Sequence, residues 1–378
     1  MRSLRERFGW RHTLAFAVFL FLVLRTFDSP TGFSSLAGFG AYTQSLRTDT
    51  IRELNYAVKP ESFGYDGQFY AQLAMDPTLR DPDFTEAIDA PAYRSRRILL
   101  PAVAYALGMG RPPLILQVYS LLNVACWFVF AWQVAGLIPT SEPPGRRFAR
   151  WAGVLFSVGV LDSVRYSMTD LPAVVLMLSM IRAMDGQRTS GSAAFYALAV
   201  LCKETSIPAW LARAPARLQP LKPWLAWVAL GILAVLPFAA WYAYVLSVFE
   251  PYVGARGNLT WPLAGMLDRT IHAVGQLLSG NPDTRYLFGV AAAAGFSLQL
   301  VLLLLSARPS EGVWRLGCIY GVLMLFLGVE PWRGYWAVAR IVIPLTLAFN
   351  LYLPGQRRFW PYWILGNATL LHGWMRFW

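Results

Sequence analysis

The sequence contains little charge for its length. Charged residues make up 14% of the 378 residues. The hydrophobic residues (Ala, Val, Ile, Leu, Met, Phe, Trp, Tyr and Cys) make up 56%. A soluble globular protein carries about 25% charged residues, because such residues cover the surface that water solvates. This chain cannot cover a surface of that kind, and its mean hydropathy is +0.42. The composition therefore predicts an integral membrane protein whose main partner is the lipid bilayer.

Cysteine and histidine are also scarce. The three cysteines, Cys126, Cys202 and Cys318, each lie inside an apolar run, and no two of them form a CxxC motif. The three histidines, His12, His272 and His372, are scattered along the chain. This pattern excludes a disulfide framework and a thiolate or histidine metal site. The sequence also lacks the GxSxG and HExxH motifs, which argues against an intramembrane protease or an acyltransferase. These residues predict no cofactor, and they leave open whether the protein uses a divalent cation.

Long apolar runs recur along the whole chain and predict its fold class. They cover residues 12–27, 114–138, 151–163, 171–184, 191–203, 205–216, 223–248, 287–306, 313–329, 337–354 and 360–376. We expect an all-α, polytopic transmembrane helical bundle of about 11 spans, which forms one integral membrane domain over residues 1–378. No small-x-small cleavage site follows the first run, so we expect that run to remain as a helix rather than to be removed as a signal peptide.

Basic residues concentrate in the loops on one side of this predicted bundle. If the N-terminus is inside and the chain crosses at every run, the inside segments hold 16 basic and four acidic residues. That excess of 12 equals the net charge of the whole chain, +12. The positive-inside rule then predicts a multi-pass protein of the inner (cytoplasmic) cell membrane with a cytoplasmic N-terminus. The excess of basic residues is therefore explained by membrane orientation, and it gives no support to nucleic-acid binding.

The largest polar segment, residues 28–97, is predicted to form an outer loop that carries surface helices. It holds 10 of the 21 acidic residues. The apolar run 98–109 follows it, and as a helix these 12 residues reach about 18 Å, less than the roughly 30 Å of a bilayer core. We therefore expect a helix in the outer leaflet at 98–109, with residues 114–376 forming the remaining transmembrane bundle.

Asp66 is the candidate catalytic residue of this outer loop. It lies between Gly64 and Gly67, at the start of a helical pattern that Pro77 ends. A carboxylate at a helix start lies near free amide groups and the positive end of the helix dipole, which keep it ionised. That suits a general base or a metal ligand. A plain N-cap of a membrane-surface helix is the alternative interpretation.

The run Tyr65-Asp66-Gly67-Gln68-Phe69-Tyr70, followed by Pro91-Ala92-Tyr93-Arg94-Ser95-Arg96-Arg97, resembles a group of bacterial membrane glycosyltransferases. These enzymes belong to the broad GT-C fold class, which includes protein mannosyltransferases and aminoarabinose transferases. The similarity covers the chain from its N-terminus to about residue 210. It implies a polyprenyl-phosphate-linked sugar donor, transfer on the outer face, donor contacts from Tyr65, Gln68 and Tyr70, and an acidic catalytic residue. No second acid follows Asp66, so a paired-acid metal site is not implied, and Asp66 acts alone or with Asp170.

Several basic residues are candidates for binding the donor phosphate. Arg94, Arg96 and Arg97 precede the predicted outer-leaflet helix, and arginine binds phosphate oxygens well; snorkelling at the interface is the alternative for each. Further candidates lie in a short outer turn, in an apolar stretch and in a late outer loop: Arg165, Asp170, Lys203, Glu204, Arg333 and Arg340. Adjacent charges inside an apolar stretch, such as Lys203-Glu204, are costly in lipid and indicate function. The alternatives are an N-cap for Asp170 and an internal Lys203–Glu204 ion pair.

Two function classes remain from the sequence. The first is a glycosyltransferase that transfers a sugar from a polyprenyl phosphate to a lipid, glycan or protein acceptor. The second is a transporter or flippase for a lipid-linked or small anionic substrate. Transporters commonly have two similar halves with ionisable residues near the bilayer midplane. Here the halves differ and the outer charge gathers in one loop, which favours the enzyme.

Overall fold

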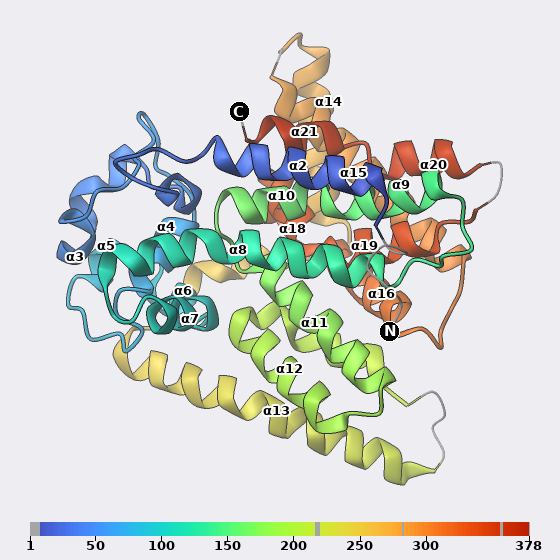
Figure 1. Ribbon diagram of the computed structural model, residues 1–378, viewed down its shortest axis with the longest axis horizontal. Coiled ribbons are helices and arrows are strands. Elements are labelled where there is room, and N and C mark those ends of the chain that lie inside the picture. The colour runs from blue at the N-terminus through green and yellow to red at the C-terminus, as the bar shows by residue number, and fades with distance from the viewer. Residues whose placement is uncertain (1–7, 216–219, 282, 356–357, 378) are drawn as a thin grey trace.

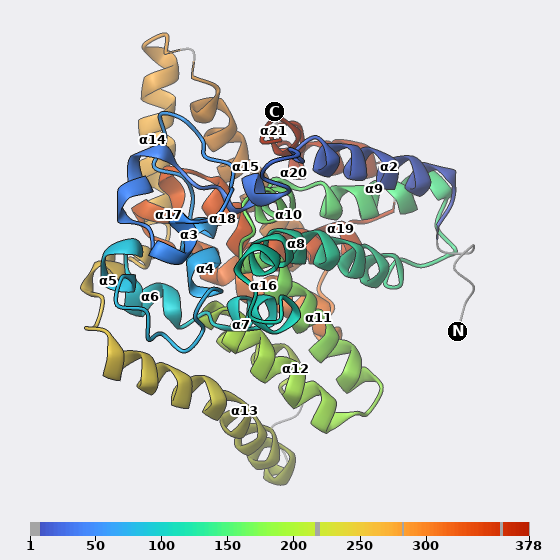
Figure 2. The same ribbon diagram turned by 60° about the vertical axis from the view of Figure 1, so that its left-hand side comes forward.

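The computed structural model describes residues 8–215, 220–281, 283–355 and 358–377. Five arginines of the predicted inside segments, Arg2, Arg5, Arg7, Arg217 and Arg357, lie outside these residues. The described part is all-helical (Figures 1 and 2). Within it no β-strand forms, and β pairing is limited to three isolated bridges. The predicted all-α class is therefore confirmed.

Three helices are long and apolar enough to cross a membrane: α8 (Pro112–Ala135), α13 (Leu221–Val248) and α15 (Thr284–Leu305). The 24 residues of α8 extend about 36 Å, more than a bilayer core needs. In α13 only 11% of the apolar window is buried inside the protein. An apolar helix that leaves this much surface uncovered is compatible with an integral membrane protein, because lipid can cover that surface.

The structure does not confirm the predicted count of about 11 spans, because several apolar runs are interrupted. Run 151–163 divides between α9 (Pro144–Leu155) and α10 (Val158–Arg165), and α10 meets α11 (Asp170–Asp185) at a bend of 120°. These two bent helices pass the length test only as one broken span. Run 205–216 forms a 3-10 helix, η3 (Glu204–Arg213), in which Pro208 removes a backbone donor.

The remaining apolar runs form short helices. Runs 337–354 and 360–376 each divide in two, and the other runs give helices of 14 or 15 residues. The helices concerned are α2 (Trp10–Leu24), α12 (Thr189–Cys202), α16 (Gly312–Leu325), α18 (Trp336–Ile341), α19 (Ile343–Tyr352), α20 (Phe359–Gly366) and α21 (Leu370–Met375). At 1.5 Å per residue, a 15-residue helix reaches about 22 Å, so none of these reaches the length of a full span.

Aromatic side chains fix the N-terminal helix on the bundle. The ring of Phe19 on α2 stacks on Trp127 of α8 at a centroid distance of 3.7 Å. The indole of Trp127 donates to the Leu155 carbonyl oxygen at 3.0 Å, and the indole of Trp151 on α9 donates to Ala131 at 3.0 Å. Both tryptophans are fully buried, so their N–H groups need these acceptors. Helices α2, α8 and α9 run alongside one another in both views (Figures 1 and 2).

Short helices of the first polar segment cover one end of the bundle (Figures 1 and 2). They are η1 (Ser34–Ala37), η2 (Ala41–Leu46), α3 (Asp49–Arg52), α4 (Gly67–Leu73), α5 (Phe84–Ala87) and α6 (Pro91–Ser95). The short apolar helix expected at 98–109 follows as α7 (Leu99–Leu107). We call residues 28–97 the cap loop.

Two glycines allow α4 to approach the bundle closely. A Cβ atom on Gly67 would lie 2.1 Å from the Tyr166 carbonyl oxygen, in the turn between α10 and α11. Gly64 has a φ of 80°, in the left-handed region that favours glycine, and its backbone N–H lies near Gly40. The two glycines therefore bring the start of α4, with Asp66, against the α10–α11 turn, which is followed by Asp170, the first residue of α11.

A second polar region follows α13. It contains η4 (Val253–Asn258) and α14 (Ala264–Leu278), and α17 (Val329–Arg333) packs on both. Helix α14 and the first turns of α15 project from the bundle as a hairpin in both views (Figures 1 and 2).

Candidate functional site

A cavity of about 720 Å³ lies between the cap loop, the α10–α11 turn, the start of η3 and the α17–α18 segment. It is within the usual range of small-molecule sites, about 300–1,000 Å³. Ten charged residues line it: Asp66, Asp89, Arg94, Arg96, Arg97, Asp170, Lys203, Glu204, Glu330 and Arg340. Eight of these are residues that the sequence singles out. The fold thus brings together charges that are up to 274 positions apart in the chain, from Asp66 to Arg340.

Asp66 is joined to Arg94 by a forked contact. The Nη1 and Nη2 atoms of Arg94 lie 2.9 and 3.0 Å from the two carboxylate oxygens of Asp66. The same guanidinium donates to Asp89 at 2.8 and 2.9 Å, so one arginine links two carboxylates. The Asp66 side chain keeps 34% of its surface exposed, which leaves it reachable from the cavity.

The predicted cap role of Asp66 is not present. Asp66 occupies the N-cap position of α4, but its backbone is already helical and its side chain accepts no capping hydrogen bond. Burial disfavours the charged carboxylate, and the positive charges of Arg94 and Arg340 outweigh that effect, so the pKa of Asp66 lies below its ordinary value. The guanidinium groups, rather than the helix start, keep Asp66 ionised.

Glu204 pairs with two arginines of the cap loop. Its carboxylate accepts from Arg97 at 2.6 and 2.8 Å and from Arg96 at 2.7 Å. Arg97 also donates to the hydroxyl oxygens of Tyr70 and Tyr93 at 2.6 and 2.9 Å, so each of its three guanidinium nitrogens has a partner. Arg96 differs, because its Nε atom is buried and has no hydrogen-bond partner.

Lys203 points the other way and pairs with Asp170. Both side chains are buried, and the Nε atom of Arg340 lies 3.5 Å from the second oxygen of Asp170. The backbone of Lys203 is extended, with φ −158° and ψ 124°, so it sends the adjacent side chains of 203 and 204 in different directions. The internal Lys203–Glu204 pair is therefore wrong. Asp170 is the first residue of α11 and does not serve as its N-cap.

A fully buried aspartate behind the cavity is not among the sequence-based candidates. Asp162, in α10, accepts from Arg340 and from Arg376, the latter at 3.0 Å. The hydroxyl of Tyr65 lies 3.4 Å from the same carboxylate and accepts from Arg340. The rule that a charge inside an apolar run indicates function applies to Asp162 as it does to Lys203, and would have identified it. Tyr93 and Asp89, also part of the site, give no such signal.

Three of the predicted donor-binding residues lie away from the cavity. The amide of Gln68 donates to Phe63 and accepts from Gly40 and Thr43, so it fixes the cap loop. Arg165 donates to the Ser35 carbonyl oxygen at 2.8 Å. Arg333 lines a second pocket instead. Tyr65 and Tyr70 do not line the cavity but hold its arginines through their hydroxyl groups.

The cavity contains matched charge: five acidic and five basic side chains line it. Ion pairs hold most of these groups in place, so the cavity is preorganised rather than strongly positive. The groups with capacity left for a ligand include the accessible carboxylate of Asp66 and the Arg96 guanidinium, which bonds Glu204 through Nη2 and keeps Nη1 without a hydrogen-bond partner among the described residues. In the part of the chain that the structure describes, no cluster of three His, Cys, Asp or Glu side chains could hold a metal ion.

No protein-family model, curated protein or solved structure matches this chain. The fold and the site therefore define only a class: an all-helical protein with apolar helices compatible with membrane insertion and a cavity lined by ten charged side chains.

Proposed function

We propose that the protein is a membrane glycosyltransferase that transfers a sugar from a polyprenyl-phosphate donor to an acceptor hydroxyl. The observation that carries this proposal is the cavity, whose lining combines an accessible carboxylate, Asp66, with arginines of the cap loop, Lys203 before η3 and Arg340 of α18. Sugar transfer from a lipid phosphate needs both kinds of group, a proton acceptor and cations that stabilise the departing phosphate.

Asp66 is the general base in this proposal. The acceptor oxygen attacks the anomeric carbon, the bond from that carbon to the phosphate oxygen breaks, and the acceptor proton passes to Asp66. A carboxylate with a lowered pKa is a weak base, yet it stays ionised. Its negative charge stabilises the oxocarbenium-like transition state, and the acceptor proton becomes acidic as the new bond forms. Asp170, locked by Lys203 and Arg340, positions the cavity wall rather than taking the proton.

Arg96 is the principal ligand of the donor phosphate in this proposal. Its guanidinium contacts Glu204 through Nη2 at 2.7 Å, while its Nη1 group has no hydrogen-bond partner among the described residues and can donate to a ligand. Arg94 and Arg97 use their donors on carboxylates and tyrosines. They fix the positions of Asp66 and Glu204 around the phosphate and contribute charge without a direct bond.

An apolar groove of about 370 Å³ supports the lipid part of the donor. It lies between α12, η3 and α13, and its lining contains Tyr196, Trp210, Trp227, Ile232 and Leu236. Helix η3 contributes Pro208 to the charged cavity and Trp210 to this groove. A polyprenyl chain in the groove would therefore leave its phosphate beside η3, at the cavity.

The proposal includes the orientation derived from loop charge. The cap loop lies on the outer face of the inner membrane, the N-terminus is cytoplasmic, and the interrupted helices complete a bundle of about 11 crossing segments. With this orientation the cavity opens where a lipid-linked donor presents its sugar to acceptors outside the cell.

Labelled polyprenyl-phosphate sugars, tested as a panel with purified protein in nanodiscs, check the function directly. We expect transfer or slow donor hydrolysis with one member, and Arg96→Gln should weaken donor use by about tenfold to a hundredfold, the effect of losing a charge-assisted bond of about 1.5–3 kcal/mol. Arg80→Gln is the matched control, because Arg80 is an exposed arginine of the cap loop outside the cavity.

Two results would count against this function. The first is an Arg96→Gln protein of normal stability that uses the donor as well as the Arg80→Gln control. The second is vesicle-reconstituted protein that moves a lipid-linked or small anionic substrate between leaflets without any transfer, which is the behaviour of the transporter or flippase alternative.

A further inference from the structure

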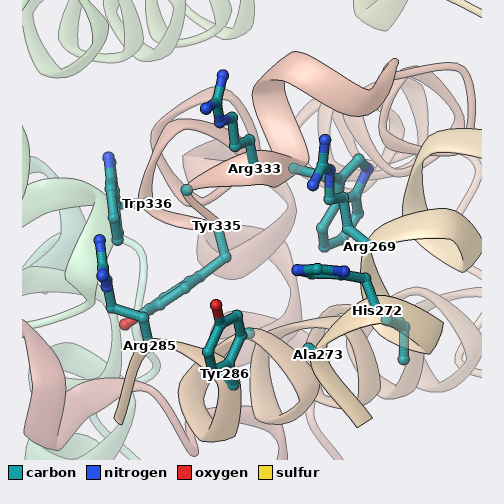
Figure 3. Close-up of a pocket in the computed structure, with 12 residues that line it drawn as sticks. Arg269, His272, Ala273, Arg285, Tyr286, Arg333, Tyr335 and Trp336 are labelled. Atoms are coloured by element: carbon teal, nitrogen blue, oxygen red, sulfur yellow. The ribbon is translucent and has the colours of Figure 1, made fainter. Parts of the chain in front are cut away.

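A second pocket of about 290 Å³ lies between α14, the start of α15 and the α17–α18 segment. Hydrogen-bond donors and aromatic rings dominate its lining. Figure 3 shows three arginines around it, with a histidine ring and tyrosine side chains between them: Arg269, Arg285, Arg333, His272, Tyr286 and Tyr335. No acidic side chain is among its lining residues. This differs from the charged cavity, in which carboxylates match the arginines.

Buried donors in the pocket lack partners. The indole N–H of Trp332 and the hydroxyl of Tyr335 are buried and form no hydrogen bond, and both side chains line the pocket. The Nε atom of Arg269 is buried and has no hydrogen-bond partner either. An indole N–H can only donate, so an acceptor atom is what would satisfy it. A buried polar group without a partner destabilises the protein, and a bound acceptor would remove that cost.

The acidic neighbours of two arginines hold them loosely. The Nε atom of Arg269 lies 3.6 Å from a carboxylate oxygen of Asp268, and the Nη1 atom of Arg333 lies 3.8 Å from one of Glu330. Both carboxylates are mostly exposed. Exposed ion pairs of this length contribute little to stability, so a ligand can replace the carboxylate at either guanidinium. Arg285 is different, since it bonds Asp283 at 2.5 and 2.7 Å.

The opposite face of α14 is apolar and exposed. Four residues spaced by four, three and four positions form this stripe: Leu267, Ile271, Val274 and Leu278. Arg269, His272 and Ala273 lie on the other side of the helix and line the pocket. An amphipathic helix with such a stripe suits the membrane interface, where the apolar face contacts lipid. The pocket is then at the depth of lipid headgroups.

The second pocket and the charged cavity share a wall. Within the α17–α18 segment, residues 332–336 line the second pocket, whereas 330, 331, 337, 340 and 341 line the charged cavity. A molecule held in the second pocket is therefore one chain segment away from the cavity that contains Asp66.

We infer that this second pocket binds a phosphate or carboxylate group of the acceptor, with Arg269, Arg333 and the indole N–H of Trp332 as its ligands. The anion-binding part stands on the pocket alone, while the acceptor role rests on the proposed function. The aromatic walls of Tyr286 and Trp336 leave room for the small group that carries the anion.

Direct binding tests the anion site without any assay of transfer. Full-length protein in nanodiscs is titrated with phosphatidate and, separately, with glycerol 3-phosphate, which carries the same phosphate without a lipid. We expect Arg269→Gln combined with Arg333→Gln to weaken binding about tenfold or more, and Arg80→Gln to leave it unchanged. Restoring the charge with Lys at position 333 should recover part of the affinity.

The two ligands distinguish the source of the anion. Binding of phosphatidate alone supports a lipid-borne group, and binding of both supports a group reached from water. If the double variant has a normal melting temperature and binds both ligands as tightly as the Arg80→Gln control, the anion site is wrong.

A transfer assay then tests the acceptor role. With an acidic acceptor, the double variant should raise KM for the acceptor at least tenfold and leave KM for the donor within twofold. An unchanged acceptor KM would overturn the acceptor role. If the protein transfers no sugar at all, the proposed function fails while the binding titration still decides the anion site.

Discussion

The forked contact between Asp66 and Arg94 determines what the Asp66 carboxylate can do. Arg94 fixes both oxygens at 2.9 and 3.0 Å and is itself fixed by Asp89. A carboxylate oriented in this way loses little freedom when a substrate arrives, which is the structural requirement for a positioned base. If the proton from the acceptor reaches Asp66, the charge that binds Arg94 falls, and Asp89 keeps the guanidinium in place.

Replacing Asp66 with Asn should lower the transfer rate by about 10²–10⁴-fold, because the amide cannot accept the proton. Asp76→Asn is the matched control in the same loop. The Asp76 carboxylate accepts from the backbone N–H groups of Thr78, Arg80 and Asp81 at 2.8–3.0 Å, so its role is to fix a turn. Initial rates with the active donor check this, together with melting temperatures. A fall in stability with unchanged specific activity of Asp66→Asn would contradict the base.

The pH dependence of the rate should report the pKa of Asp66. Its pKa lies below the ordinary value, so the base stays ionised and the acid limb of the pH–rate profile should lie at a lower pH than for an ordinary aspartate. Arg94→Gln removes the largest favourable charge and leaves burial, which raises the pKa, so the limb should move upward. Profiles of kcat/KM for both proteins check the direction. A limb that does not move in Arg94→Gln would show that a different group titrates.

Element by element, the sequence predicts where apolar helices form but not where they break. Runs 114–138, 223–248 and 287–306 form long helices, and none of the three contains a charged residue. The interruptions elsewhere depend on tertiary contacts as well as on proline. Arg150, for example, donates to the carbonyl oxygens of Asn350 and Leu353 at the end of α19, a contact 200 residues away in sequence. No local pattern contains that information.

The docking of α4 on the α10–α11 turn gives a prediction at this scale. Gly67→Ala places a Cβ about where the Tyr166 carbonyl oxygen lies, and backbone cannot rotate away as a side chain can. We expect a loss of about 1–3 kcal/mol of stability from overpacking, with reduced activity because Asp66 shifts. Thermal unfolding in detergent measures the loss. Gly275→Ala in α14, where an added Cβ would meet nothing within 4 Å outside its own helix backbone, is the control and should stabilise slightly or have no effect.

For the whole molecule, the sequence predicts the all-helical class and most of the charged site. Asp66 could be selected from its place between two glycines at a helix start, and Arg94, Arg96 and Arg97 from their place before the short apolar helix. Asp170 could be selected from a short polar turn, and Lys203 and Glu204 because they interrupt an apolar stretch. Their pairing could not be selected. From the sequence, Lys203 and Glu204 could form an ion pair with each other. In the structure Lys203 pairs with Asp170, and Glu204 pairs with Arg96 and Arg97. Which partner a charge takes depends on how the cap loop packs on the bundle, and that packing relies on Gly64 and Gly67.

The orientation of the molecule in the membrane is the last prediction, and it rests on the loop charges. Cysteines introduced at Ser45 and Ser310 test it, because both serines are exposed and lie in segments that the charge count assigns to opposite sides. In a background with Cys126 and Cys318 changed to Ala, an impermeant thiol reagent added to intact cells should label Ser45→Cys and spare Ser310→Cys. Permeabilised cells should label both, which excludes burial as the cause of protection. Labelling of Ser310→Cys alone would invert the molecule and place the charged cavity on the cytoplasmic side, where the donor would have to be presented from within the cell.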